Sequence, residues 1–205
     1  MNTKTDNSSS QLVVAPAGNP DGKGNNGFLA DWNSSAPRGV VSKPARQLLS
    51  EFFTSMLVLS AELRYRPTVG KQNFLYWIDG NWALSLISPG QWSAKHREGF
   101  AGTCILQADR TWTLNPSENL LTKGPLADAV ARAYESFRET LETDKTLEEI
   151  LPFHVSHMSY WQRLYANALS RSIRATVILG DQTRKKAKDW LPALPSGAEL
   201  AEVVE

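Results

Sequence analysis

Few residue types in this chain can carry acid–base or metal chemistry. The histidines are His96, His154 and His157. His154 and His157 have the i, i+3 spacing of two ligands on one helix, but a catalytic zinc site needs a third protein ligand. Cys104 or a glutamate could supply it, and the spacing selects neither. We predict no metal and no cofactor, and we interpret this pair as loop histidines that precede a helix.

The single cysteine, Cys104, fits a structural role better than a catalytic one. It lies beside Ile105 in a run typical of a strand, where a thiol usually acts as a small apolar core group. A nucleophile needs a nearby base and an electropositive, partly exposed setting. No Gly-x-Ser-x-Gly motif is present, and spacing alone identifies no acid–base pair of carboxylates. We assign no catalytic residue and favour a protein that is not an enzyme.

The loop from Ser88 to Gly99 is the best local candidate for a site. It places an amphipathic aromatic side chain beside cations, a combination that suits recognition of a peptide, an anion or an extended strand. Alternatively, the tryptophan closes the open end of a sheet and the charged residues are solvated. The predicted binding residues of this loop are Trp92, Lys95, His96 and Arg97.

A second candidate lies near the N-terminus. Phe28, Leu29 and Trp32 would share one side of a single helical turn. They interrupt a stretch, residues 1–41, that is rich in Asn, Ser, Gly and Pro and that we expect to be a disordered arm. The island either folds back onto its own domain or serves as a short motif for the groove of a partner.

Composition excludes several classes of function. The 205 residues carry 22 Lys+Arg and 21 Asp+Glu, a formal net charge of +1, so no global field attracts nucleic acid or an anionic membrane. The aromatic stretch has few Lys or Arg around it, and we rank nucleic-acid binding low. No run approaches the ~20 apolar residues of a membrane span, and the N-terminus lacks a secretory core. We expect a cytoplasmic protein.

Helical and strand patterns place these candidates. An amphipathic pattern predicts a helix over residues 43–64, and similar spacing predicts helices over 124–141 and 159–179. Between them, residues 74–78, 82–87, 100–107 and 111–114 are typical of strands. We predict an α+β fold in which a small antiparallel meander of about four strands packs with three to four helices. The predicted domains are a disordered arm (1–41), one α+β domain (42–180) and a flexible basic, then acidic, tail (181–205).

The first turn sets which side chains share a face of the sheet. A two-residue loop at Asp79–Gly80 pairs Trp77 with Trp82, whereas a three-residue loop that includes Asn81 exchanges the faces. In either register both faces carry large apolar groups. Either helices cover both faces, or one face is a binding surface.

The stretch from Phe74 to Leu114 contains a distinctive set of residues: Phe74–Leu75–Tyr76, Ser85–Leu86–Ile87–Ser88–Pro89, Trp92, Phe100–Ala101–Gly102, Leu106, Asp109, Trp112 and Thr113. Through these residues it resembles a small family of conserved proteins of unknown function found in bacteria and animals. The resemblance implies a shared domain and supplies no catalytic residue.

These observations favour a non-enzymatic protein-binding or adaptor module. The alternative is a small-molecule-binding protein, or an enzyme of unrecognised type, with a pocket near Trp92 and His96. Self-association through the long helices is a third possibility. The sequence names no partner.

Overall fold

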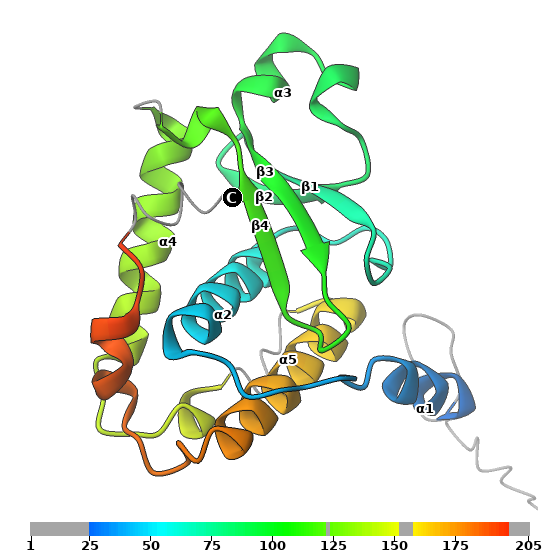
Figure 1. Cartoon of the computed structure of the whole chain (residues 1–205). Helices are drawn as coiled ribbons and strands as arrows, with labels where there is room; N and C mark the ends of the chain where they lie inside the picture. Colours follow the sequence, from blue (N-terminus) through cyan, green and yellow to red (C-terminus); the bar gives the residue numbers. More distant parts are fainter. Residues whose placement is uncertain (1–24, 122–123, 152–157, 197–205) are drawn as a thin grey trace, which may run out of the picture.

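The computed structural model describes residues 25–121, 124–151 and 158–196. It confirms the α+β class, with one four-stranded antiparallel sheet packed with helices. Figure 1 shows α2 and α5 below the sheet, α4 along one side and α1 at the edge of the molecule. In the described ranges, every helix is too short or too polar to span a bilayer. The α-helices of the described residues are α1 (Asn25–Ser34), α2 (Ala45–Ser60), α3 (Ala94–Glu98), α4 (Pro125–Leu141) and α5 (Tyr160–Leu179).

Helix α2 forms the centre of the core. Leu48, Leu49, Phe52 and Val58 are almost fully buried, as the spacing of apolar residues predicts. The helix ends at Ser60 and not at the predicted residue 64. Beyond it the chain is extended, because the backbone of Glu62 bonds to strand β2 in a short parallel bridge. This tertiary pairing replaces the last helical turn.

The strands do not follow one another across the sheet. They are β1 (Gln72–Ile78), β2 (Asn81–Ser85), β3 (Phe100–Leu106) and β4 (Trp112–Pro116). Their order is β2-β1-β3-β4, with every neighbouring pair antiparallel. The predicted sequential meander is therefore wrong in strand order, because β3 returns to the free side of β1. As a result β2 is an edge strand, and a long connection, residues 86–99, crosses the end of the sheet.

The β1–β2 turn has the two-residue form. Trp77 pairs with Trp82 and Leu75 with Leu84. Asp79 and Gly80 both have positive φ, 49° and 83°, as a type I′ turn requires. This register turns Leu75 and Leu84 towards the core that contains α2. Phe74 and Tyr76 alternate to the second face, where they contact Phe100.

One buried ion cluster joins three segments of the chain. The Lys43 cluster consists of Lys43, Glu51 and Asp109, and it joins the approach to α2, the helix itself and the β3–β4 turn. The Lys43 ammonium donates to both carboxylates, and the three side chains are only 8% to 9% exposed. Asp109 also accepts from the amide and hydroxyl of Thr111.

The chain after α5 packs on the domain. A 3-10 helix, η4 (Ala187–Ala193), lies beside the lower part of α4, seen in red in Figure 1. Trp190 is 2% exposed and belongs to the core. The predicted flexible tail from residue 181 is therefore wrong for this segment. It is held also by Lys186 and Lys188, each 2.8 Å from Asp144.

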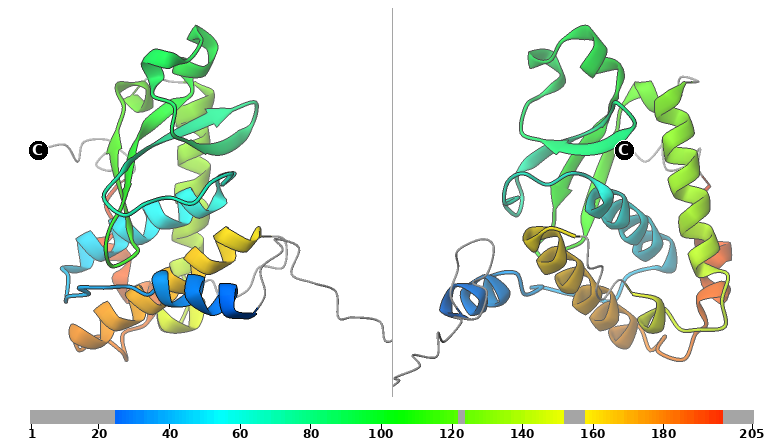
Figure 2. Two further views of the ribbon diagram at one scale, coloured as in Figure 1. Left: turned by 90° about the vertical axis from the view of Figure 1, so that its right-hand side faces the viewer. Right: turned by 180° about the vertical axis from the view of Figure 1, so that it is seen from behind.

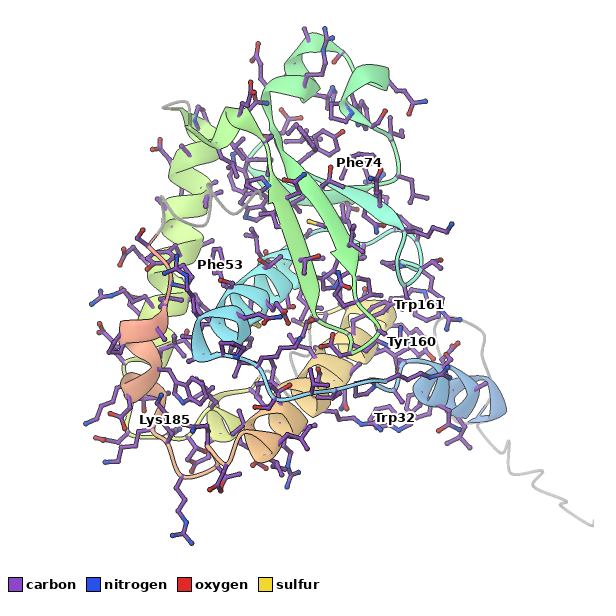
Figure 3. All side chains as sticks on the ribbon, viewed as in Figure 1. Trp32, Phe53, Phe74, Tyr160, Trp161 and Lys185 are labelled. Atoms are coloured by element: carbon purple, nitrogen blue, oxygen red, sulfur yellow. The ribbon has the colours of Figure 1, made fainter. Side chains whose placement is uncertain are left out.

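Residues 25–41 likewise differ from a disordered arm. Helix α1 is bound to α5: the hydroxyl of Tyr160, at the start of α5, donates to Asp31, and the guanidinium of Arg171, further along α5, lies over the Trp32 ring. Figure 3 shows Trp32, Tyr160 and Trp161 gathered where α1 approaches α5. The remainder of the predicted arm, residues 1–24, lies outside the described residues.

Candidate binding groove along strand β2

The connection from β2 to β3 carries the predicted loop site and is built from two short helical turns. The first is a 3-10 turn, η1 (Pro89–Gln91), with proline at its start, where a missing amide hydrogen costs nothing. The Gln91 side chain reaches back to the amide and hydroxyl of Ser88. Helix α3 follows. The dipeptide Ser88–Pro89 thus ends the hairpin and turns the chain over the second face.

Two contacts hold the far end of this loop against the sheet. The Asn119 side chain donates to the carbonyl of Arg97 at 2.8 Å. At Gly99 the backbone approaches Trp77 so closely that an added Cβ would lie 2.1 Å from the Trp77 carbonyl oxygen. Glycine is required there by contact, and the Trp77 amide donates to the Gly99 carbonyl at 2.8 Å.

A continuous chain of rings links the loop to the sheet. Phe100 contacts Tyr76, whose ring meets Trp92 edge-on with centroids 6.0 Å apart. Trp92 stacks on His96, with centroids 4.5 Å apart and planes inclined by 22°. The Tyr76 hydroxyl donates to the carbonyl of Ile87, and burial raises the pKa of Tyr76 to about 12. Tyr76 is thus a neutral hydrogen-bond donor that fixes the loop.

A groove of about 980 Å³ follows the outer side of β2. One end is formed by Trp92 and His96, and the other by Ser159 and Gln162 at the start of α5. Residues of α3 and of the start of α5 both line the groove, and Figure 2 shows these two elements far apart along the molecule in both views. Its remaining lining residues are Ser60, Glu62, Leu63, Arg64, Tyr65, Tyr76, Ile78, Asn81, Trp82, Ala83, Leu84, Ser85, Leu86 and Ile87.

The groove exposes apolar surface beside an incompletely paired sheet edge. Leu86 and Ile87 are 60% and 42% exposed. On the outer edge of β2, the backbone amide of Glu62 donates to the Trp82 carbonyl, and the Leu84 amide donates to the Glu62 carbonyl. Within the described residues, the pairing stops there, and the outward Leu84 carbonyl has no backbone partner. Such an edge can accept a further extended chain.

Three groups of the groove, Glu62, Arg64 and His96, could carry charge, and each already contacts a polar neighbour. Glu62 and Arg64 form an exposed ion pair at 2.9 Å. The His96 Nδ1 lies 2.8 Å from the Ser93 hydroxyl, three residues earlier at the start of α3. A serine nucleophile also needs its base oriented by a third group, and no side chain in the described part of the chain hydrogen-bonds to the second ring nitrogen of His96. The arrangement supports binding better than covalent catalysis.

The structure brings together only part of the predicted site. Trp92 and His96 line the groove as a stacked pair. Lys95 is paired with Asp79 at the hairpin tip, 2.9 Å away. Arg97 is exposed on α3 and does not line the groove.

The other predicted binding residues lie on a separate surface. Phe28 and Leu29 are 43% and 54% exposed on α1, and Phe28 contacts the half-buried Trp32. None of the three lines the groove. The structure therefore contains two candidate surfaces and not one combined site.

The sequence did not reveal two parts of the groove: the exposed side chains of Leu86 and Ile87, which we call the aliphatic rim, and the segment that follows α2. Leu86 and Ile87 are adjacent apolar residues just past a strand, where alternation would expose one of them, and that signal was present. Glu62 carried no such signal, because it falls inside the helix predicted over residues 43–64, and Tyr65 directly follows that predicted helix. The hydrogen bond between Ser93 and His96 was predictable, because the two residues are three positions apart.

Cys104, His154 and His157 were the other candidates for chemistry in the sequence. Cys104 is buried in the core, and burial raises the pKa of its thiol, so it is poorly suited to nucleophilic chemistry. His154 and His157 lie outside the described residues. Among the residues that the structure does describe, no group of three His, Cys, Asp or Glu side chains could hold a metal ion.

Comparison with known proteins adds no functional information. No protein-family model matches the chain, and neither a curated protein nor a solved structure matches it. The resemblance to a family of unknown function stays a prediction.

Proposed function

We propose that this chain is a protein-binding module that takes an extended segment of a partner protein into the groove along β2. The observation that carries the proposal is the elongated groove of about 980 Å³ beside the partly paired edge of β2. Strand addition at such an edge provides backbone hydrogen bonds, and pockets for alternate side chains provide selectivity.

The lining indicates what the segment should contain. Leu86 and Ile87 offer an aliphatic rim, and Trp92 offers an aromatic wall. Large apolar side chains of a partner would remove these surfaces from water, with a gain of roughly 25 cal/mol for each Å² buried. The Glu62–Arg64 pair provides one charge of each sign. We therefore expect an extended, apolar-rich segment with no strong net charge.

A small-molecule ligand is the second candidate. The stacked pair of Trp92 and His96, with Tyr76 behind it, supports this alternative. Pockets for such ligands usually enclose most of the ligand surface and have volumes of roughly 300–1,000 Å³. The volume of the groove falls in that range, but its elongated form beside a strand edge favours a peptide. We place the protein in the cytoplasm, in keeping with its single cysteine.

Selection from a displayed library of random peptides tests the proposal. The wild-type protein should enrich apolar-rich sequences, and Leu86→Asp should bind them at least tenfold more weakly, since it places a charge on the aliphatic rim. Ile178→Asp is the matched control, because Ile178 is similarly exposed, at 52%, but lies on α5 away from the groove. Failure to enrich any sequence, or equal binding by all three proteins, would refute the peptide proposal.

A further inference from the structure

A second cavity lies on another part of the molecule, where the chain before α2 meets the sheet and α5. It has a volume of about 410 Å³. Ser34 and Ser35 form one wall, and Arg110 of the β3–β4 turn forms another. The segment from Arg66 to Val69, together with Leu164 and Tyr165 of α5, completes it. It shares no lining residue with the β2 groove.

The charge lining this cavity is entirely positive. Arg66 and Arg110 enter it, and no Asp or Glu of the described chain is among its lining residues. The nearest acidic partner, Asp31, lies 3.5 Å from the Arg66 guanidinium and is also hydrogen-bonded by Tyr160. Among the described residues, Arg66 therefore has one carboxylate partner, which also accepts from Tyr160, and Arg110 has no carboxylate partner.

The hydrogen-bond partners of the Arg110 side chain in the described part of the chain are neutral. Its guanidinium donates to the backbone carbonyls of Ser34, at 2.5 Å, and Ala36, at 3.3 Å. Its own backbone has a positive φ of 72°, which is uncommon for a residue with a side chain. Burial is the main cause that lowers the pKa of Arg110; Tyr165 opposes it, and the nearby charges of Arg38 and Arg66 lower the pKa by smaller amounts. An anion beside it would relieve this repulsion.

The remaining lining is suited to a small polar ligand. Thr68 provides a hydroxyl, and Val69 and Leu164 provide apolar contacts. The hydroxyls of Ser34 and Ser35 already donate to the carbonyls of Asp31 and Trp32. The hydroxyl of Tyr165 is committed to the carbonyl of Pro67, at 3.1 Å, which fixes the floor of the cavity. Paired guanidinium groups are the side chains that best match the planar or branched oxygens of carboxylates and phosphates.

We propose that this cavity binds a small oxyanion, as a phosphate or carboxylate group carried on a small molecule, between Arg66 and Arg110. The ligand would also stabilise the attachment of α1, because both arginines contact residue 34 at the end of that helix. The site is independent of the proposed peptide groove.

Titration of the full chain by nuclear magnetic resonance tests the proposal, with inorganic phosphate and acetate as probes at constant ionic strength. The side-chain Nε–H signals of Arg66 and Arg110 should shift saturably with at least one probe and not with chloride. Saturation by phosphate alone assigns a phosphate group, and saturation by acetate assigns a carboxylate. Shifts that grow linearly, or that chloride reproduces, would overturn the proposal.

Two variants locate the binding. Arg110→Gln should weaken it about tenfold or more, as expected for loss of a charged hydrogen-bond partner. Val69→Glu should weaken it similarly by supplying an internal carboxylate, and it leaves the arginine contacts with α1 in place, so it decides the matter if Arg110→Gln fails to fold. Arg132→Gln, an exposed position on α4, is the control and should bind as the wild type does. Unchanged binding by Val69→Glu would contradict the assignment.

Discussion

Replacing Lys43 by methionine should expose the energetic role of the Lys43 cluster. Methionine keeps much of the length and apolar character of the lysine stem but removes its charge. Glu51 and Asp109 would then remain as buried carboxylates without their shared cation, since Lys43 donates to both. Removing one partner from a buried ion pair usually costs about 3–5 kcal/mol.

The local contacts place the expected loss at the lower end of that range. Asp109 keeps two donors from Thr111, and Glu51 keeps the side-chain amide of Gln47 at 2.8 Å. These hydrogen bonds partly stabilise the charges that remain. We expect Lys43→Met to lower the free energy of unfolding by about 3 kcal/mol and the melting temperature by roughly 6–12 °C.

The pH dependence of the folding stability provides a second, independent test of the Lys43 cluster. Burial alone would raise the pKa of Asp109, but hydrogen bonds from Lys43 and Thr111 outweigh burial and hold it low. Its contribution is complete above the ordinary pKa of about 3.9 and is lost as the pH falls through the lowered value. Burial alone would lower the pKa of Lys43, but Asp109 and Glu51 raise it. That contribution is complete below about pH 10.4 and is lost as the pH rises through the raised value.

The wild-type cluster should therefore be stabilising from about pH 4 to pH 10. In Lys43→Met, burial would raise the pKa of Asp109, and its protonation would relieve the repulsion. The stability deficit of the variant should shrink between pH 7 and pH 5. Urea unfolding at both pH values measures it, with Lys71→Met as the control because Lys71 is exposed. A loss below 1 kcal/mol, or a deficit that is equal at both pH values, would refute the reasoning.

Two further substitutions test the packing. Trp82→Ala should destabilise the fold by about 3 kcal/mol, since Trp82 is buried in the core and contacts Trp77 with ring centroids 5.1 Å apart; an unchanged melting temperature would place it outside the core. Trp190→Ala should cost about 3–5 kcal/mol in urea unfolding, because η4 is part of the core. A wild-type unfolding midpoint for this variant would restore the flexible-tail interpretation.

The sequence predicted the elements whose patterns are local. Helix α2 follows from apolar spacing, and the Asp79–Gly80 turn follows from residues that tolerate positive φ. The capping serine of α5 was also within reach, since Ser159 accepts from the Gln162 amide and the two side chains form a capping box.

The sequence did not reveal the groove, because the groove depends on strand order. Nothing local shows that β3 returns beside β1, and without that return β2 would not be an edge strand. Nor does local spacing show that Glu62 leaves the helical pattern to pair with β2. Trp190 was missed for a similar reason, because the charges and prolines around it suggested a tail while tertiary packing buried it.

Hydrogen exchange on the complex with a selected peptide tests the central claim most directly. If the peptide adds to β2, exchange should slow at the outward-facing amide of Trp82, and the signals of Leu86, Ile87 and Trp92 should shift. The exposed Phe28 and Leu29 on α1 should be unaffected. Perturbations confined to α1, or the absence of added protection along β2, would contradict binding in the groove.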